Sequence, residues 1–245
     1  MKGLNQMKIN QEELKKAAGE ASIKYVEDGM KIGLGSGSTV YWLIQALGQY
    51  IKDGGKIEGI PSSEQTQRWA AEAGVPLTTF SKVEQLDVTI DGADEVDKNL
   101  QLIKGGGGAL FREKIIAAAA KTLIIIVDET KKVKQLGRFP LPVEVLPFGW
   151  EVTANRISKL GGKPELRKKD GDIYRSDNGN YILDCSFSYI ADPAILESQL
   201  KNIVGVVETG LFVNMADKVI VGKSDGLEVI EKNCEGGRLK NSPCS

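Results

Sequence analysis

The sequence has no histidine and only 3 cysteines among its 245 residues. Cys185 falls in an expected strand, whereas Cys234 and Cys244 lie in a polar tail. This spacing fits neither a disulfide framework nor a zinc site. Without histidine, Ser-His and Cys-His catalysis are excluded. Any acid-base chemistry near neutral pH must therefore come from carboxylates, Lys, Tyr or Cys.

An excess of charge of either sign is also missing, as are long hydrophobic runs. The chain has 32 Lys and Arg against 33 Asp and Glu, and no long block of like charges. Nucleic acid and anionic membranes are therefore poor candidates for partners. The apolar runs are much shorter than the roughly 18 residues of a membrane span, and we see no signal-peptide pattern before the first expected helix. We therefore expect a cytoplasmic protein.

The most informative stretch is residues 87–114, DVTIDGADEVDKNLQLIKGGGGALFREK. An alternating run ends at Asp91, Asp94 follows three residues later, and Glu95 is next to it. Lys104 precedes four consecutive glycines, and a helical pattern containing Glu113 comes after them. Consecutive glycines cost conformational entropy on folding, so such a run is typical of a backbone that must lie close to a ligand. Carboxylates, an ammonium group and bare amides in this order predict a small-molecule active site.

A second glycine-rich loop, GLGSGST at 33–39, lies between an expected strand at 30–32 and an expected helix at 40–51. Strand, Gly/Ser loop and helix form a phosphate-binding arrangement, because loop amides and the helix N-terminus supply donors. A dinucleotide fingerprint would need a third glycine where Ser38 stands, and no Walker lysine follows. A phosphate-sized anion fits better than a dinucleotide. A plain tight turn that caps the helix is the alternative reading.

From residue 11 to about 137, expected helices and strands alternate. The helices are expected at 11–26, 40–51 and 65–73, and the strands at 30–32, 56–60, 75–80 and 88–90, followed by the fully apolar run 123–127. Such alternation predicts an α/β fold with a doubly wound, mostly parallel, Rossmann-like sheet. Ligands bind beyond the carboxyl ends of the strands in these sheets, where residues 36–39, 91–94 and 128–131 fall.

The pattern changes after Pro140, Pro142 and Pro147. Strand (141–146), helix (150–160), strand (164–168), strand (181–187), helix (193–202) and strand (206–210) follow, which is the order of a small α+β ferredoxin-like domain. The turn signal Asp177-Asn178-Gly179-Asn180 is expected to join the middle two strands. A strand at 218–221 is expected to return to the first sheet. The prediction is a Rossmann-like domain at 8–139 and 213–232, an inserted domain at 140–212, and a disordered tail at 233–245.

Several motifs recur together in one known family. They are GSGST at 35–39, DGADE at 91–95, KGGGGAL at 104–110, REK at 112–114, VDETK at 127–131, FPLPVEV at 139–145, DNGNYILD at 177–184 and GVVETGLF at 205–212. Together they resemble type A ribose-5-phosphate isomerase, over about residues 10–232. The resemblance implies interconversion of D-ribose 5-phosphate and D-ribulose 5-phosphate in the pentose phosphate pathway, without a cofactor or metal, by a homodimer.

The resemblance also assigns residues. It implies that Glu113 is the general base and that Asp91, Asp94 and Lys104 are its catalytic neighbours. The residues it implies for substrate binding are Lys15, Ser36, Gly37, Ser38, Thr39, Asp91, Gly92, Ala93, Asp94, Lys104, Gly105, Gly106, Gly107 and Lys131.

The chemistry of an aldose-ketose isomerase is consistent with these roles. A proton moves from C2 to C1 through an enediolate, so one base and one donor to the developing oxyanion are needed. Without histidine, Glu113 is the natural base and Lys104 the donor, and Asp91 or Asp94 could open the sugar ring. Each residue also has a plain structural reading: Glu113 as a charge in the first turn of a helix, Asp91 and Asp94 as turn residues, and Lys104 as a solvated cation.

Two other functions have weaker support in the sequence. A non-catalytic sugar-phosphate sensor would carry a DNA-binding helix-turn-helix segment, for which the residues before the first expected helix leave no room. A nicotinamide-dependent oxidoreductase is opposed by the imperfect glycine fingerprint.

Overall fold

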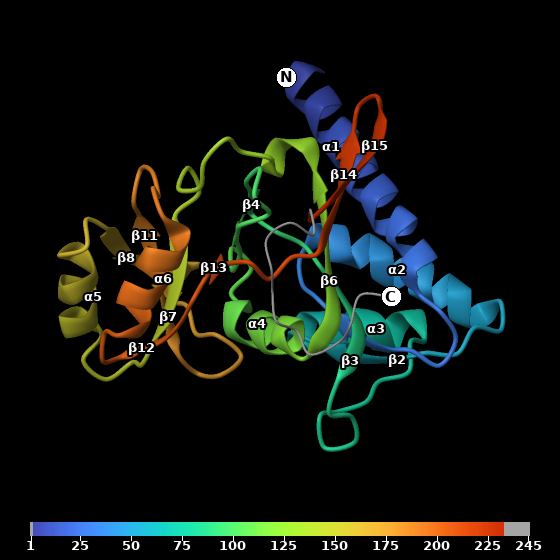
Figure 1. Cartoon of the computed structure of the whole chain (residues 1–245), viewed down its shortest axis with the longest axis horizontal. Coiled ribbons are helices and arrows are strands. Elements are labelled where there is room, and N and C mark those ends of the chain that lie inside the picture. The colour runs from blue at the N-terminus through green and yellow to red at the C-terminus, as the bar shows by residue number, and fades with distance from the viewer. Residues whose placement is uncertain (1, 233–245) are drawn as a thin grey trace.

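A six-stranded sheet forms the larger part of the protein, in a computed structural model that describes residues 2–232 (Figure 1). Its strands are β1 (Lys31–Leu34), β2 (Glu58–Pro61), β3 (Leu86–Asp91), β6 (Ala120–Asp128), β14 (Lys218–Lys223) and β15 (Gly226–Glu231), in the order β15-β14-β6-β3-β1-β2. All neighbours pair in parallel except β15, which is antiparallel to β14. The predicted doubly wound, mostly parallel sheet is therefore confirmed.

Helices cover both faces of this sheet. They are α1 (Lys2–Ala21), α2 (Ser38–Lys52), α3 (Glu64–Ala73) and α4 (Leu110–Ala118), with short 3-10 helices η1 (Ser22–Tyr25) and η2 (Glu129–Lys131). Side chains alternate along β6, so Ile124 and Ile126 join the core formed with α2, while Ile125 and Val127 join the opposite core with Phe212. The first helix begins earlier than predicted and turns into η1 after Ala21.

Two glycines let α1 pack closely against its neighbours. A Cβ atom on Gly222 of β14 would lie 2.0 Å from the carbonyl oxygen of Leu14, and one on Gly19 would lie 2.8 Å from Trp42 Cβ. Glycine at these positions lets α1 lie directly on β14 and α2. Consequently Lys15, on the same helix, lies beside the N-terminus of α2.

The smaller part is a four-stranded antiparallel sheet with two helices, on the left of Figure 1. It contains β7 (Leu141–Val145), α5 (Trp150–Ser158), β8 (Lys163–Leu166), β11 (Tyr181–Ser186), α6 (Pro193–Lys201) and β12 (Val206–Thr209), in the order β12-β7-β11-β8. This is a βαββαβ unit, as predicted. Its own buried cluster includes Val143, Ile157, Leu183 and Leu200. The exact limits of the two domains stay a prediction.

Two predicted features differ in the structure. Residues 75–80 form only an isolated bridge, Gly59 to Leu77, instead of a strand. Pro76 has no N–H to donate, which hinders an extended ladder there. The link from β8 to β11 contains its own hairpin, β9 (Lys168–Lys169) and β10 (Asp172–Ile173), so the turn at 177–180 does not join those strands directly.

A three-stranded sheet was not predicted. It consists of β4 (Glu95–Val96), β5 (Leu102–Ile103) and β13 (Leu211–Phe212), in the order β13-β5-β4, and it lies between the two larger sheets (Figure 1). Strands this short carry no readable alternation. The predicted disordered tail, with Cys234 and Cys244, lies outside the described residues. Within residues 2–232, none of the helices combines the length and the apolar character needed to cross a membrane.

Candidate active site

The predicted motifs meet at one edge of the large sheet. β1 and β3 are neighbours, and the strand order reverses between them, since β2 lies beyond β1 and β6 lies beyond β3. In doubly wound sheets this switch point opens a crevice at the carboxyl ends of the strands. The loop after β1 lies against the end of β3: a Cβ atom on Gly35 would be 2.1 Å from Asp91 Oδ1. Glycine at position 35 is required for this contact.

A cavity of about 160 Å³ opens at this point. Every predicted substrate-binding residue except Asp91 lines it. Glu113 lines it as well, and so does Gln11, which was not predicted. The lining residues are Gln11, Lys15, Ser36, Gly37, Ser38, Thr39, Gly92, Ala93, Asp94, Lys104, Gly105, Gly106, Gly107, Glu113 and Lys131.

Lys104 is the centre of the buried end of this cavity. Its Nζ donates to the carbonyl oxygen of Gly92 at 2.6 Å and lies 3.0 Å from Asp91 Oδ2 and 3.3 Å from Glu113 Oε1. Asp91 is 0 %, Lys104 2 % and Glu113 4 % exposed. Asp91 lies beneath the ammonium group, where its Oδ1 accepts from the amides of Ser36 and Gly92. The ammonium group of Lys104 thus lies between the carboxylate of Asp91, which two amides hold in place, and the carboxylate of Glu113, which faces the cavity.

Burial dominates the electrostatics of these groups. It raises the pKa of Glu113 to about 8, against the attraction of Lys104 and with added repulsion from Asp91 and Asp94. Burial likewise raises the pKa of Asp91, although Lys104 and two amides oppose it. For Lys104, burial alone would lower the pKa, but Asp91 and Glu113 outweigh it and raise the value. The ammonium group therefore stays charged, while Glu113 can take up and release a proton near neutral pH.

The glycine loop after Lys104 forms one wall of the cavity. Gly105 and Gly108 have φ of 102° and 88°, in the left-handed region that favours glycine. The amide of Gly106 donates to Asp94 Oδ2 at 2.8 Å, and a Cβ atom there would lie 2.6 Å from Asp94 Oδ1. The run of glycines therefore brings bare backbone against a carboxylate that faces the cavity.

The small domain holds this loop from outside. Arg167 Nη1 donates to the carbonyl oxygens of Gly105 and Gly106, at 2.9 and 3.1 Å. Asp184 fixes the guanidinium through two contacts, of 2.9 and 2.5 Å. Sequence reasoning missed both residues, because nothing in the local pattern of β8 or β11 marks a contact with a loop about 60 residues away.

The exposed end of the cavity is suited to an anion. Ser38 and Thr39 begin α2, and Gly37 precedes them with φ of 97°. Lys15 comes from α1 and Lys131 from η2. Helix N-termini and lysines both favour a phosphate group. Gln11 lies one helical turn before Lys15 on the same face, a spacing that could have indicated it from sequence.

Hydroxyl groups support Ser36 from behind. Ser36 Oγ lies 2.7 Å from Ser62 Oγ and 3.2 Å from Ser63 Oγ, and Thr66 Oγ1 donates to the carbonyl oxygen of Gly35 at 2.7 Å. Ser62 and Thr66 are fully buried. The start of α3 therefore fixes the loop that follows β1.

Glu95 is structural and does not line the cavity. Its two carboxylate oxygens accept from the amides of Gly137 and Phe139, at 2.8 and 2.6 Å. Over the described part of the chain, no group of three or more Asp, Glu or Cys side chains could hold a metal ion.

Comparison with known proteins identifies the family. The family model for ribose 5-phosphate isomerase A (phosphoriboisomerase A) matches residues 58–226. The chain belongs to the ribose 5-phosphate isomerase A family. It is 62% identical over 220 residues to ribose-5-phosphate isomerase A 1 of Oceanobacillus iheyensis, covering 89% of this chain and 98% of that one. It is 56% identical over 217 residues to ribose-5-phosphate isomerase A of Bacillus anthracis, covering 88% and 99%.

Solved members of this family have the same fold. A D-ribose-5-phosphate isomerase in complex with phospho-erythronic acid superposes with a TM-score of 0.88 at 43% identity, covering 90% of this chain and 99% of the other. The ribose 5-phosphate isomerase A of Methanocaldococcus jannaschii gives 0.86 at 41% identity, with coverage of 90% and 99%. Family membership makes the chain an isomerase, and the resemblance drawn from the motifs is confirmed.

Proposed function

We propose that this isomerase interconverts D-ribose 5-phosphate and D-ribulose 5-phosphate through an enediolate, with Glu113 as the base. The carrying observation is the pairing of a buried Glu113 with Lys104, 3.3 Å apart, in a cavity whose other end is an anion site. In this layout the anion-binding end of the cavity would hold the phosphate of a substrate, and Glu113 and Lys104 would act on carbons at its other end. It matches a phosphorylated sugar, which is anionic at one end and reactive at the other.

Binding begins at the phosphate. The first amides of α2, the hydroxyls of Ser38 and Thr39, and the ammonium groups of Lys15 and Lys131 would hold it. Energy from this remote group can be used to place C1 and C2 beside Glu113. The distance between the two ends of the cavity then selects the length of the sugar.

Proton transfer would fall to Glu113. The ionised carboxylate removes the proton from C2 and returns it to C1, so one group serves both carbons. Lys104 already holds a charge next to that carboxylate, and it would stabilise the negative charge that develops on the substrate oxygen. Because both groups are buried, this electrostatic stabilisation is stronger than it would be in water.

The two aspartates would have different roles. Asp94 lines the cavity and can contact sugar hydroxyls, so it is the better candidate for opening the ring. Asp91 lies beneath Lys104 and would act by holding the ammonium group in place. The phospho-erythronic acid bound to the solved relative supports the overall scheme, since its phosphate matches that of the substrate and its carboxylate matches the negative charge of an enediolate.

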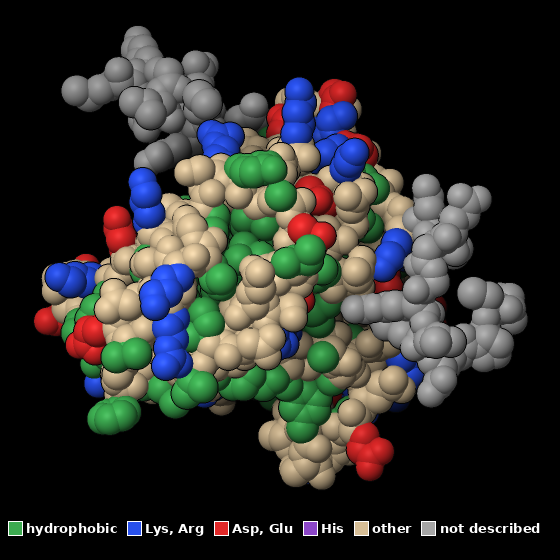
Figure 2. Space-filling view, turned by 60° about the vertical axis from the view of Figure 1, so that its left-hand side comes forward, with side chains coloured by type: hydrophobic (Ala, Val, Ile, Leu, Met, Phe, Trp, Pro, Cys, Tyr) green, Lys and Arg blue, Asp and Glu red, His purple; other side chains and the backbone are tan. Residues whose placement is uncertain are grey.

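A homodimer in the cytoplasm, acting in the pentose phosphate pathway, remains part of the proposal. Exposed apolar side chains support self-association: Phe148 is 96 % exposed, and Leu146, Val152 and Val204 are exposed on the same small domain. Figure 2 brings this domain towards the viewer, and hydrophobic side chains are visible on its surface. Sedimentation measurements on the parent and on Phe148→Ser would test the homodimer.

The decisive experiment is incubation of the purified protein with ribose 5-phosphate, in the presence of a chelator, followed by a ketose assay. We expect ketose to accumulate with no change in nicotinamide absorbance, and C2 to exchange its proton with solvent deuterium. Free ribose is the matched control, and it should be turned over very poorly because it lacks the phosphate. Absence of ketose, or equal turnover of ribose, would contradict the proposal.

A further inference from the structure

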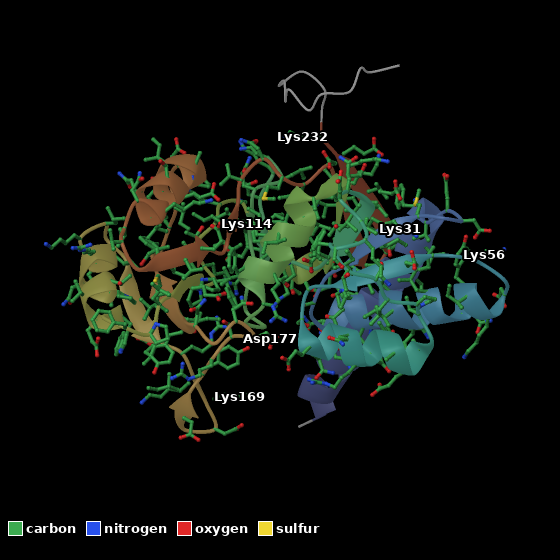
Figure 3. All side chains as sticks on the ribbon, turned by 90° about the horizontal axis from the view of Figure 1, so that it is seen from below. Lys31, Lys56, Lys114, Lys169, Asp177 and Lys232 are labelled. Atoms are coloured by element: carbon green, nitrogen blue, oxygen red, sulfur yellow. The ribbon has the colours of Figure 1, made fainter. Side chains whose placement is uncertain are left out.

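A second, larger cavity adjoins the active site. It measures about 620 Å³ and lies between α3 of the large domain and the β9–β10 hairpin of the small domain. Figure 3 shows that hairpin, with Lys169 labelled, on one side, α3 on the other, and Asp177 between them. A volume of this size is in the range of sites for metabolites and is much larger than one phosphate needs.

The charges around this cavity are unbalanced. Its charged lining consists of Arg68, Arg167, Lys168, Lys169, Arg175 and a single carboxylate, Asp177. The whole chain, by contrast, has a net charge of −1. Arg167 is already paired with Asp184, and the other four cations make the cavity a local concentration of positive charge on a nearly neutral protein.

The single carboxylate does not compensate these cations. Asp177 Oδ2 accepts from the amide of Glu64 at the start of α3, at 2.8 Å, and lies 3.5 Å from Arg112. Arg68 and Arg175 donate to neutral oxygens, of Gln65 and Gly179. Among the residues with described side chains, no carboxylate lies within salt-bridge distance of Arg68, Lys168, Lys169 or Arg175.

The cavity shares two walls with the active site. Ser36 and Gly37 on one side, and Gly106 and Gly107 on the other, line both spaces. A ligand in the larger cavity would therefore contact the two loops that bind the sugar phosphate. The lining also includes Trp69 and Tyr174, whose rings offer flat apolar surface beside the cations.

We propose that this second cavity binds a metabolite with two or more linked phosphoryl groups, such as a nucleoside triphosphate. Several close negative charges match the arginines and lysines, which hold phosphoryl oxygens through fixed forks or as point charges. This binding does not depend on the proposed function.

Calorimetric titration of the full chain, at low ionic strength and with a chelator, tests the binding. The probes are inorganic tripolyphosphate, ATP and orthophosphate. We expect tripolyphosphate to bind at least about tenfold more tightly than orthophosphate, since it can reach several cations at once. In Lys168→Gln/Lys169→Gln this affinity should fall about fivefold or more, while orthophosphate binding at α2 stays unchanged. The variant should keep the parent turnover, because neither lysine lines the catalytic cavity.

Lys52→Gln/Lys56→Gln is the matched control, since it removes the same charge from two exposed lysines that do not line the cavity. Figure 3 shows Lys56 far from Lys169. Tighter binding of ATP than of tripolyphosphate would identify a nucleotide as the ligand, and the reverse would identify inorganic polyphosphate; both support the site. Equal affinity for tripolyphosphate and orthophosphate, or equal weakening in both double variants, would overturn it. Because calorimetry reads binding alone, an inactive protein would not be mistaken for an empty site.

Discussion

Two buried lysines in this protein have nearly the same surroundings and different consequences. Lys104 and Lys114 both lie near the ring of Phe212, with Nζ 5.3 and 4.9 Å from its centroid. Each donates to a backbone carbonyl oxygen at 2.6 Å, of Gly92 and of Leu211. Each also pairs with two carboxylates. Lys104 belongs to the active site, whereas Lys114, labelled in Figure 3, joins α4 to the small domain through Glu197 and Glu208.

The carboxylates explain the difference. Burial acts to raise the pKa of Glu208, but Lys114, the amide of Thr209 and Lys201 together lower it. The pKa of Glu113 instead rises to about 8, because burial exceeds the attraction of Lys104. Among the described residues, Glu113 Oε2 has no hydrogen-bond partner. The donors around Glu208 therefore keep it ionised in a structural ion pair, whereas Glu113 has too few donors to offset its burial and can exchange a proton.

The largest expected effect is that of Glu113→Gln on turnover. The amide keeps the shape of the side chain but cannot accept a proton from carbon, so the rate should fall ~10²–10⁴-fold. Ribose 5-phosphate should still protect the variant against thermal unfolding, because the phosphate site is intact. Glu208→Gln is the matched control, and its turnover should change little. If Glu113→Gln retains more than about a tenth of the parent rate, the base lies elsewhere, and Asp94 is the next residue to test.

Replacing the two lysines by methionine should separate stability from catalysis. Lys114→Met leaves Glu197 and Glu208 without their shared cation, and we expect the free energy of unfolding to fall by about 3 kcal/mol. Lys104→Met removes the donor to the oxyanion and should reduce turnover ~10²-fold or more. Urea denaturation and the ketose assay measure the two effects. Equal losses of turnover in both variants, at a temperature where both are folded, would remove the distinction.

The pH dependence should follow Glu113. A general base acts in its ionised form, so kcat/KM should fall about tenfold per unit as the pH drops below the pKa near 8. The same fall of kcat/KM with decreasing pH should be seen in Glu208→Gln, because the carboxylate of Glu208 lies outside the cavity. Rates measured from about pH 6 to pH 9 would show it. A flat profile across this range would mean that Glu113 is already ionised at neutral pH.

The contrast between the lysines also shows what the sequence could and could not predict. Strand-loop-helix patterns place 36–39, 91–94 and 128–131 at the carboxyl ends of parallel strands, so their convergence follows from fold class alone. Lys104 could be singled out in the sequence because four glycines follow it, whereas Lys114, next to Glu113, has no local feature that marks its role. Asp91 lies in the same motif as Lys104 and was predicted with it, but Glu208 is 94 residues away from Lys114, a contact that local patterns do not encode.

The same limit applies to the small elements. The order of expected strands and helices from 141 to 210 predicted the small domain, whereas the two-residue strands β4, β5 and β13 are too short for any period. The turn at 177–180 was read as a hairpin because Asn-Gly favours one. In the structure its polar side chains instead turn inward to the buried Glu144, whose Oε1 accepts from Ser176, Asn178 and Asn180. A buried acceptor far away in sequence determined this loop.

The smallest expected effect, and the finest test of the comparison, is on stability. The pKa of Glu113 is about 8 in the folded protein and 4.5 as its ordinary value. Between these values the folded state holds a proton that the unfolded state has released, so Glu113 makes the protein less stable as pH rises from about 4.5 to 8. Glu113→Gln should therefore be more stable than the parent at pH 8, by more than about 1.4 kcal/mol, the equivalent of one pKa unit.

Glu208→Gln should show the opposite pH dependence. Because the pKa of Glu208 is lowered, its contribution to stability is present above its ordinary pKa of 4.5 and is lost as the pH falls through the folded value. That variant should be less stable than the parent at pH 8 and approach it in acid, while the advantage of Glu113→Gln should disappear below about pH 4.5. Urea denaturation of the parent, Glu113→Gln and Glu208→Gln, at pH 8 and below about pH 4.5, measures these differences. If Glu113→Gln were destabilised at pH 8, the cavity would be stabilising the carboxylate of Glu113, and the two lysines would then differ in location but not in physical role.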